Sequence, residues 1–248
     1  MSGHILHETL DGLSVIRMNR PEKKNALTGD MYDRMTGALE EGEGSGDVRA
    51  HVLFGTGHVF TAGNDIKDFL ATASGGDRAN NAVTFLKRLV TLEKPIIAGV
   101  DGLAIGIGTT MLLHCDLVYA TSGSLFKTPF LDLGLVPEAA SSLIAPRVMG
   151  QQRAFELLCL GEGFSAARAA AAGLINDIVD VDDLEPHTLE TARRIAQKPP
   201  EAMRMARSLL RGSNAEILAR IDEESNLFAK RLTSDEARLA FEKFLQRK

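Results

Sequence analysis

The run Gly102-Leu-Ala-Ile-Gly106-Ile-Gly108 has the composition of a backbone site for a ligand. It follows an apolar segment and precedes a stretch with helical spacing, and a glycine turn in that place lets a ligand approach main-chain N–H groups closely. The run is not a dinucleotide-binding fingerprint, because Met111 stands where the third glycine would fall, and the chain has no P-loop motif. A glycine turn by itself serves equally for close packing between elements. The run therefore indicates either a ligand-binding turn or a packing contact.

Glu138 is an acidic residue that directly follows Pro137. Its apolar neighbours Phe130, Leu133 and Leu135 would keep water out and make the carboxylate more basic by desolvating its charged form. A second interpretation is structural, since a carboxylate that follows a proline suits the first turn of a helix. Asp132 is the other acid near Glu138 in the sequence, and a role as a second catalytic group stays open.

Other reactive residue types lack the spacing that a site requires. The six histidines show no HExxH or paired pattern, so we expect no metal site. Cys115 and Cys159 form no CxxC pair and no disulfide framework. Ser141 and Ser142 lack the GxSxG elbow of a serine hydrolase and are interpreted as helix interior.

Alternating strands and helices must position these residues. A hairpin is expected over residues 4–18, turning at Asp11-Gly12, and Thr28 is expected to cap a helix that breaks at 41–47. Further strands are predicted at 48–54, 96–100 and 117–120, with a helix over 83–90. From Glu138 onward the pattern predicts helices at 138–148, 151–160, 166–172, 184–197, 200–211, 215–232 and 235–246, and one strand at 174–179. This alternation is typical of βαβ units around a largely parallel sheet that is buried on both faces.

Composition excludes several classes of partner. The chain has 248 residues, 44% hydrophobic, with 28 Lys and Arg against 33 Asp and Glu, so no broad basic surface is available for nucleic acid. The most apolar stretch, 96–107, is interrupted by Asp101 and glycines and is too short to span a bilayer. The first residues show no basic region followed by an apolar one, so no signal peptide is expected. We expect a cytoplasmic protein.

A second glycine segment, Phe60-Thr-Ala-Gly63-Asn64-Asp65-Ile66-Lys67, favours the interpretation of the first one as a ligand-binding turn. Together, and in the spacing between them, the two segments resemble the oxyanion-hole segments of the crotonase (enoyl-CoA hydratase/isomerase) superfamily. The resemblance extends over nearly the whole chain, through the segments 19–27, 114–116, 133–138 and 172–174. It is nearest to the branch of 3,2-trans-enoyl-CoA isomerases.

The resemblance implies an α/β fold, with a crotonase-type ββα spiral core over residues 1–190 and a C-terminal helical trimerisation region over 191–248. It also implies a homotrimer or a dimer of trimers. Apolar residues on the predicted C-terminal helices, such as Ile217, Ile221, Leu227 and Phe228, exceed what a self-contained helix pair needs.

In that family two backbone N–H groups bind the thioester oxygen, and they correspond here to those of Asn64 and Ile107. Because backbone donors carry this role, Ile in place of Gly at 107 need not abolish it. The resemblance places the two hydratase glutamates, which position and deprotonate water, at Thr110 and Phe130, and neither of these can act as a base. Glu138 resembles the single base of the isomerase branch.

The resemblance also implies contacts with coenzyme A, which is part of the substrate, so no separate cofactor is expected. The expected substrate-binding residues are Lys24, Ala26, Leu27, Ala62, Asp65, Ile66, Phe130 and Leu133. Lys23, Lys24 and Lys67 could meet phosphates as point charges, and Lys243 could reach the ligand of a neighbouring subunit.

The implied activity is isomerisation of a 3-enoyl-CoA to the 2-trans-enoyl-CoA in fatty-acid or related acyl-CoA degradation. Glu138 would remove a proton from C2 and return it to C4. Two alternatives stay open. The first is an enoyl-CoA hydratase, or another crotonase-type lyase or thioesterase, that uses Glu138 or Asp132 on water. The second is an acyl-CoA-binding scaffold without catalysis.

Overall fold

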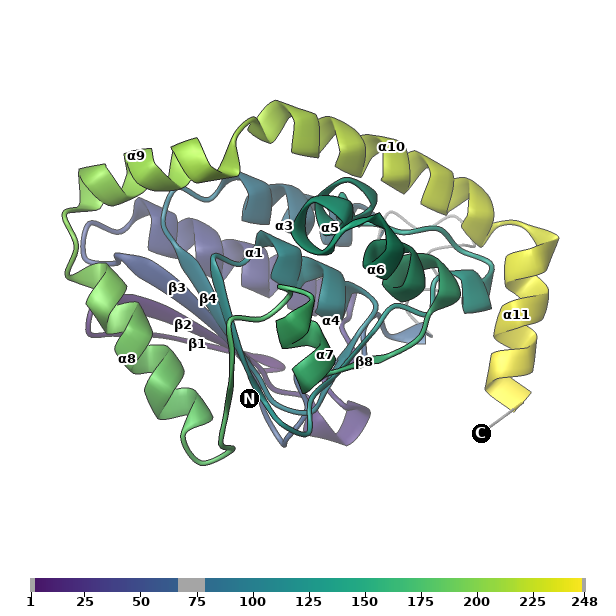
Figure 1. Ribbon diagram of the computed structural model, residues 1–248, viewed down its shortest axis with the longest axis horizontal. Helices are drawn as coiled ribbons and strands as arrows, with labels where there is room; N and C mark the ends of the chain where they lie inside the picture. Colours follow the sequence, from purple (N-terminus) through teal and green to yellow (C-terminus); the bar gives the residue numbers. More distant parts are fainter. Residues whose placement is uncertain (1–2, 67–78, 247–248) are drawn as a thin grey trace.

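A six-stranded sheet forms the centre of the protein (Figure 1). The computed structural model describes residues 3–66 and 79–246. The strands, in their order across the sheet, are β1 (Ile5–Leu10), β2 (Leu13–Met18), β3 (Ala50–Gly55), β4 (Ile96–Val100), β6 (Leu117–Thr121) and β9 (Asp177–Val179). The β1–β2 hairpin is antiparallel and all other pairs are parallel, which confirms the predicted hairpin and largely parallel sheet.

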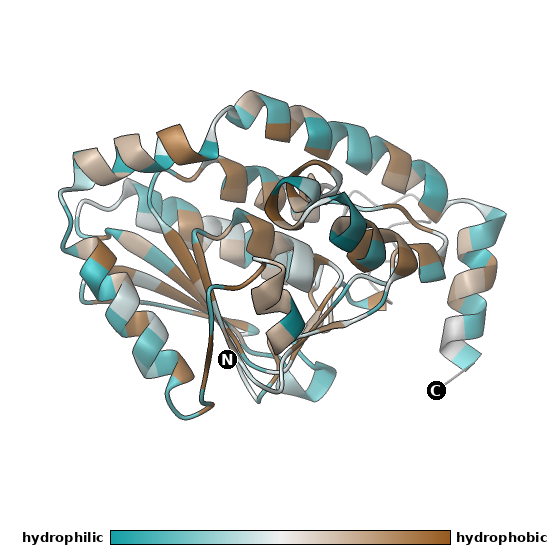
Figure 2. Ribbon diagram, in the orientation of Figure 1, coloured by the Kyte–Doolittle hydropathy of each residue, from teal (hydrophilic) through white to brown (hydrophobic). Residues whose placement is uncertain are grey.

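Apolar side chains cover both faces of this sheet. In β3, Val52 and Phe54 pack on one face with Leu184 and Leu189, whereas Leu53 packs on the other with the main core. Successive side chains of a strand point to opposite faces, so a strand that is apolar at every position must be covered on both sides. Figure 2 shows the strands as the brownest part of the ribbon.

Helices provide both layers of cover. The helix α8 crosses one face of the sheet, while α1 and α3 pack together on the other (Figure 1). Thr28 caps α1 by accepting a hydrogen bond from the Met31 N–H at 3.4 Å, as its position predicted. The α-helices are α1 (Gly29–Gly44), α3 (Ala79–Thr91), α4 (Ile107–Thr110), α5 (Ser141–Met149), α6 (Gln151–Phe155), α7 (Ala166–Ala171), α8 (Leu184–Ala196), α9 (Pro200–Arg211), α10 (Asn214–Leu232) and α11 (Asp235–Gln246). Shorter helical turns are η1 (Pro21–Lys23), η2 (Met111–His114), η3 (Leu131–Leu133) and the π-helix η4 (Glu156–Leu160).

A second, smaller sheet was not predicted. It joins β5 (Leu103–Ile105), β7 (Leu125–Lys127) and β8 (Phe164–Ser165), in that order. Strands of two or three residues are too short to show alternation in the sequence. This sheet matters for the site because β5 leads directly into the glycine turn at Gly106.

The helix predicted over 138–148 is wrong at its beginning. It starts at Ser141, and the two residues before it are left-handed, with φ of 63° at Ala139 and 53° at Ala140. Tertiary hydrogen bonds to this segment replace those of a helical first turn, as the Ala139 carbonyl accepts from His114 Nε2 at 2.8 Å. Glu138 therefore lies in a loop before the helix, and its interpretation as a first-turn carboxylate is incorrect.

The C-terminal helices wrap the remaining side of the molecule. In Figure 1, α9 and α10 run along one edge, and α11 turns back at the end of α10. The helix α10 packs against α3, and α11 packs against η3. The expected boundary at residue 190 falls within α8, and the trimerisation role of 191–248 stays a prediction. Within residues 3–66 and 79–246, no helix combines the length and apolar character needed to cross a membrane.

Candidate active site

Four chain segments lie side by side and build the site from backbone hydrogen bonds. The Thr61 N–H donates to the Leu103 carbonyl at 2.8 Å, and the Ile105 N–H donates back to the Thr61 carbonyl at 3.0 Å. On the other side, the Leu27 N–H donates to the Gly63 carbonyl at 2.8 Å. Because β5 also pairs with β7, the segments around residues 27, 63, 105 and 127 form one ladder.

Gly63 and Gly106 allow the two glycine segments to meet. Gly63 has a φ of 85°, and a Cβ atom there would lie 2.7 Å from the Ile105 carbonyl oxygen. Gly106 has a φ of 57° and a ψ of −121°, a conformation that favours glycine. Asn64 and Ile107, which follow these two glycines, line the same cavity.

The ladder leaves two donors unused. The Asp65 N–H donates to the Leu27 carbonyl, so the Asn64 N–H between Gly63 and Asp65 points away from this partner strand. Ile107 is the first residue of α4, and the first N–H groups of a helix have no intrahelical acceptor. Across the two described ranges, the hydrogen bonds found for Asn64 and Ile107 leave both N–H groups without a protein acceptor. The helix α4 is a single turn, so its dipole adds little and the hydrogen bonds themselves must supply any stabilisation of negative charge.

Glu138 is hydrogen-bonded to a residue that lies one helical turn from Ile107. The Thr110 hydroxyl, three residues along from Ile107, donates a short hydrogen bond to Glu138 Oε1. Burial raises the pKa of Glu138 to about 8, partly offset by the hydrogen bond from Thr110 and increased further by the charge of Glu224. A carboxyl with this pKa is poised to take up and release a proton near neutral pH.

Tyr32 connects the two halves of the site. This tyrosine of α1 is 3% exposed, and its hydroxyl donates to the Asn64 side-chain oxygen at 2.5 Å. Burial, and next the charge of Glu138, raise the pKa of Tyr32 well above its ordinary value, so the phenol keeps its proton. The ring packs against Phe85 with centroids 5.6 Å apart, which fixes the hydroxyl. Tyr32 thus holds the side chain of the residue that carries one of the two donors.

A cavity of about 790 Å³ opens at these donors. Asn64 and Ile107 line it, together with the predicted substrate-binding residues Ala62, Ile66, Phe130 and Leu133. Other apolar lining residues are Ile105, Leu135, Phe228, Leu239 and Phe241, and the polar ones include Lys127, Asp132 and Lys243. Asp132 is exposed at this cavity. Glu138 follows the lining residues Leu133 and Leu135 in the chain, is half-buried, and accepts its hydrogen bond from Thr110.

The remaining predicted coenzyme A residues lie beside the cavity without lining it. Leu27 is buried, and Ala26 and Lys24 flank it on the segment that pairs with 62–65. Asp65 forms a salt bridge with Arg20 at 2.7 Å, which ties this segment to the turn after β2. Lys67 lies outside the described residues.

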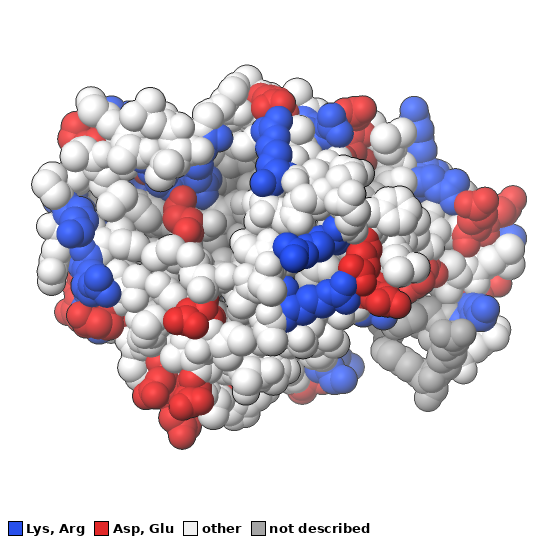
Figure 3. Space-filling model, in the orientation of Figure 1, with Lys and Arg blue, Asp and Glu red and all other residues white. Residues whose placement is uncertain are grey.

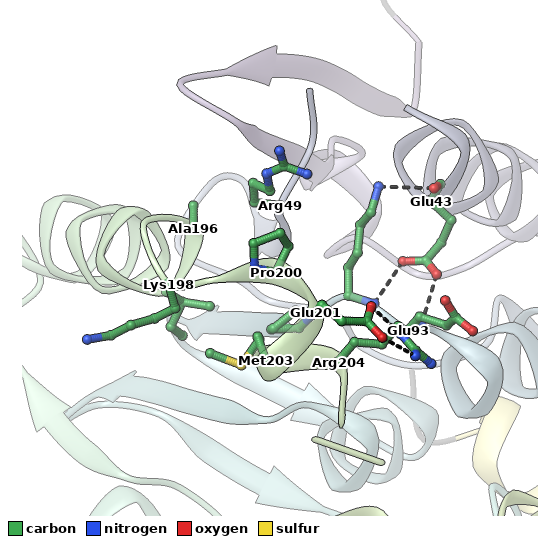
Figure 4. A pocket seen from close by; sticks show the side chains of 12 residues that line it. Glu43, Arg49, Glu93, Ala196, Lys198, Pro200, Glu201, Met203 and Arg204 are labelled. Atoms are coloured by element: carbon green, nitrogen blue, oxygen red, sulfur yellow. Dashed lines mark hydrogen bonds and ion pairs between the residues drawn. The ribbon is translucent and has the colours of Figure 1, made fainter. Parts of the chain in front are cut away.

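A second cavity, of about 210 Å³, shares no lining residue with the first and is shown in Figure 4. Several of its charged groups already have partners. Lys94 donates to the carbonyl oxygens of Gly42, Glu43 and Ser45 at 2.7–3.0 Å, while Arg204 pairs with Glu201 at 2.6 Å. These contacts tie the end of α1 to β4 and stabilise the first turn of α9. We assign this cavity a structural role.

Positive and negative side chains are mixed on the surface. Figure 3 shows Lys and Arg interspersed with Asp and Glu on the face in view, without a broad area of positive charge. A polyanion such as nucleic acid needs a contiguous basic surface. On this face the protein offers none.

Known proteins are similar to this chain in sequence and in fold. A family model described as enoyl-CoA hydratase/isomerase matches residues 8–248. The chain belongs to the enoyl-CoA hydratase/isomerase family. This confirms the resemblance on which the crotonase-type fold was predicted.

Family members of two activities are similar to this chain. Human enoyl-CoA delta isomerase 2 is 35% identical over 96% of this chain, which spans 62% of the length of that relative. A short-chain-enoyl-CoA hydratase of Clostridium acetobutylicum is 28% identical over 99% of this chain and 95% of its own. The crystal structure of an enoyl-CoA hydratase/isomerase from Pseudoalteromonas atlantica T6c has 36% identity and a TM-score of 0.94, covering 99% of this chain and 98% of that one. Membership of the enoyl-CoA hydratase/isomerase family therefore leaves the choice of reaction to the site residues.

Sequence reasoning missed three residues that surround Glu138. Thr110 was noted only as a position where a glutamate is absent, although its spacing of three from Ile107 places it one turn along the same helix. Tyr32 and Glu224 reach the site from α1 and α10, and nothing local in the sequence links either of them to residue 138. The structure of this enoyl-CoA hydratase/isomerase family member adds them to the site.

Proposed function

We propose that this protein isomerises 3-enoyl-CoA thioesters to 2-trans-enoyl-CoA thioesters with Glu138 as the single base. The proposal rests on the Glu138 carboxyl, whose pKa is raised to about 8. This carboxyl accepts a hydrogen bond from Thr110, which lies one helical turn from the Ile107 N–H. Proton abstraction next to a carbonyl needs a base of that kind close to donors for the developing oxyanion.

The reaction moves one proton and one double bond. Glu138 removes a proton from C2, and the electron pair of that C–H bond passes to the thioester oxygen, which the N–H groups of Asn64 and Ile107 bind. The dienolate then takes the same proton from Glu138 at C4, so the C3–C4 double bond is lost and the C2–C3 double bond forms. No water or second acid is consumed, which fits Thr110 and Phe130 at the positions that the resemblance assigns to the hydratase glutamates.

The carboxyl must turn toward the substrate. In the proposed reaction the side chain of Glu138 rotates from Thr110 toward C2 when the acyl group is bound. Hydrogen bonds at a catalytic base commonly tighten only in the complex with substrate. The loss of the Thr110 hydrogen bond in that rotation would make the carboxylate more basic at the moment of abstraction.

The cavity suits an aliphatic acyl group. Phe130, Leu133, Phe228 and Phe241 give it apolar walls, and Lys127 and Lys243 supply positive charge for the coenzyme. We propose that coenzyme A runs along Lys24, Ala26, Leu27, Ala62, Asp65 and Ile66, and that no further cofactor takes part.

The cytoplasmic location and the homotrimer or dimer of trimers also stay predictions. Assembly would cover exposed apolar residues of α9 such as Leu209 and Leu210, which are 84% and 89% exposed.

The discriminating experiment offers the protein three substrates separately. A 3-enoyl-CoA should give new ultraviolet absorbance from the conjugated thioester, and a saturated acyl-CoA in deuterated water should exchange its C2 proton. A 2-enoyl-CoA should be hydrated slowly or not at all. Failure of both conjugation and exchange would show that the cavity only binds acyl-CoA.

Hydration is the second candidate function, because Asp132 lines the cavity and could direct a water with Glu138. Rapid formation of a 3-hydroxyacyl-CoA from the 2-enoyl-CoA would establish it. In that case Asp132→Asn should abolish hydration, whereas under the isomerase mechanism the same change should leave conjugation largely intact.

The pH dependence of exchange follows from the raised pKa of Glu138. The base must be deprotonated, and with a pKa of about 8 it is mostly protonated at pH 6. We expect the exchange rate at subsaturating acyl-CoA to rise about tenfold per pH unit between pH 6 and 7 and to level off above about pH 8. A rate that is flat over this interval would contradict Glu138 as the base.

Replacing Thr110 by Val tests the hydrogen bond to Glu138. The two side chains are nearly isosteric, but Val cannot donate, and this donation lowers the pKa of Glu138. The variant should therefore shift the acid limb of the pH–rate profile to higher pH and lower the exchange rate at pH 7. Thr109→Val is not a suitable control, because that hydroxyl is buried and joins the glycine turn to the Ala104 carbonyl of β5. Thr91→Val, on the exposed end of α3, is a better one.

A further inference from the structure

The two residues after Glu138 adopt a conformation that must be held from outside. Ala139 and Ala140 both have positive φ, at 63° and 53°, although neither is glycine. Residues with a Cβ atom rarely adopt this region, and two in succession persist only where surrounding contacts determine them. The contacts that hold this turn also fix the direction in which Glu138 leaves the backbone.

One of these contacts comes from a buried carboxylate on α10. Glu224 is 5% exposed, and its Oε1 accepts from both the N–H and the hydroxyl of Ser142, at 3.0 and 2.5 Å. The Ala140 N–H also donates to this carboxylate. Ser142 is the second residue of α5, so Glu224 caps that helix across 82 residues of sequence.

The opposite side of the turn is held by His114 of η2, whose Nε2 donates to the Ala139 carbonyl. Burial lowers the pKa of His114 to about 4, so this imidazole stays neutral and adds no charge beside Glu138. The turn is thus fixed by one neutral donor and one carboxylate, and Glu224 is the only one of the two that can carry charge at neutral pH.

We propose that Glu224 is a positioning residue for Glu138, which fixes the left-handed turn through its hydrogen bonds to α5 and acts on the base through its charge. The inference rests on the proposed function of Glu138. The hydrogen bonds of Glu224 go to the turn and to α5, so its effect passes through the loop and through the electrostatic field.

In the described part of the chain, charged and titratable side chains approach Glu138 and Glu224 from α1 and α10. Tyr32 of α1 and Glu224 of α10 face Glu138. Arg220 approaches Glu224 through Ser142, whose hydroxyl it contacts at 3.2 Å, and its charge lowers the pKa of Glu224. The neighbouring acids of α10 are paired at the surface, Asp222 with Lys87 at 2.6 Å and Glu223 with Arg220 at 3.1 Å. Glu224 is therefore the acid of α10 whose charge reaches the base.

The test compares Glu224→Gln with Glu223→Gln in the full-length protein. Each variant removes one negative charge from adjacent positions, but Glu223 is exposed and pairs with Arg220, whereas Glu224 is buried against Ser142. The measurements are the pH–rate profile of C2 exchange on a saturated acyl-CoA, kcat and KM for a 3-enoyl-CoA, and the melting temperature. Glutamine keeps an oxygen that can accept from Ser142, so the variant should fold.

We expect Glu224→Gln to shift the acid limb of exchange to lower pH, because the charge that raises the proton affinity of Glu138 is gone. A neutral amide oxygen accepts these hydrogen bonds more weakly than a carboxylate, so the turn should be held less firmly and kcat should also fall about tenfold with KM nearly unchanged. Glu223→Gln should leave the profile and kcat as in the wild type. A profile that does not move in Glu224→Gln would overturn the proposal, whether or not the melting temperature falls.

The Glu138→Gln variant distinguishes a failure of the positioning role of Glu224 from a failure of the proposed function. If it is inactive while Glu224→Gln keeps the wild-type profile and kcat, the positioning role is wrong and the proposed function stands. If Glu138→Gln keeps its activity, the proposed function itself fails.

Discussion

Glu138→Gln should lower turnover of a 3-enoyl-CoA by about a thousandfold or more, within the range that a positioned general base contributes. Glutamine has the same shape and can still accept a hydrogen bond from Thr110, but it cannot take up the C2 proton. Binding of acyl-CoA should change little, because glutamine keeps the size of the side chain and other residues line the cavity. The measurement is single-turnover conjugation, followed by its ultraviolet absorbance, with acyl-CoA affinity determined by titration calorimetry.

The stability of the same variant provides an internal control. The pKa of Glu138 is about 8 in the folded protein, above its ordinary value of 4.5, so the folded state binds a proton that the unfolded state releases between these values. The free energy of unfolding of the wild type therefore falls as pH rises through this window, by at most about 1.4 kcal/mol per unit of pKa difference. Glutamine carries no charge, so the variant should be the more stable protein at pH 9 and gain little at pH 5. Urea unfolding at both pH values measures this difference.

Gly63→Ala has the second largest expected effect. A Cβ atom would lie 2.7 Å from the Ile105 carbonyl oxygen, and the φ of 85° is unfavourable for alanine. The segment carrying Asn64 must therefore move relative to Ile107, and the two N–H groups can no longer converge on one oxygen. Loss of one oxyanion donor costs about 10²–10³ in kcat. Exchange at C2 and conjugation should fall together, since both pass through the enolate.

The control for this substitution is Gly123→Ala, in the turn after β6, where a Cβ atom would have no neighbour within 4 Å. Gly63→Ala should remain folded, because strain at a single residue costs about 1–3 kcal/mol. If it melts cooperatively and yet keeps the turnover of the wild type, the backbone donor at Asn64 is not needed for the reaction.

The sequence predicted the central sheet well because its signals are local. The strand at 96–100 has the bounds that its apolar run indicated, and the hairpin turns at Asp11 and Gly12, whose φ angles are 52° and 79°. Thr28 is at the helix start that its side chain favours. The two glycine segments also lie side by side, as their resemblance to the family implied. Gly63 and Gly106 both have a positive φ, which favours glycine for a purely local reason.

The environment of the base could not be predicted in the same way. Pro137-Glu138 suggested a helix start, but the Ala139 carbonyl and the Ala140 N–H are bound by His114 and Glu224, and the helix begins later. The contact between Glu224 and Ser142 joins residues far apart in the chain and depends on how α10 crosses α5. A single sequence carries no local signal for such a contact.

The ladder that joins the segments at 27, 63, 105 and 127 uses main-chain atoms alone. Substitutions on those strands can therefore reshape the cavity for a different acyl group while the two N–H groups stay where they are, as Ile107 already shows at a position where the family resemblance implies glycine. Main-chain atoms would then determine reactivity, and the side-chain atoms of the same residues would determine selectivity. A scaffold with that division can acquire new substrates by ordinary point mutation without first losing its chemistry.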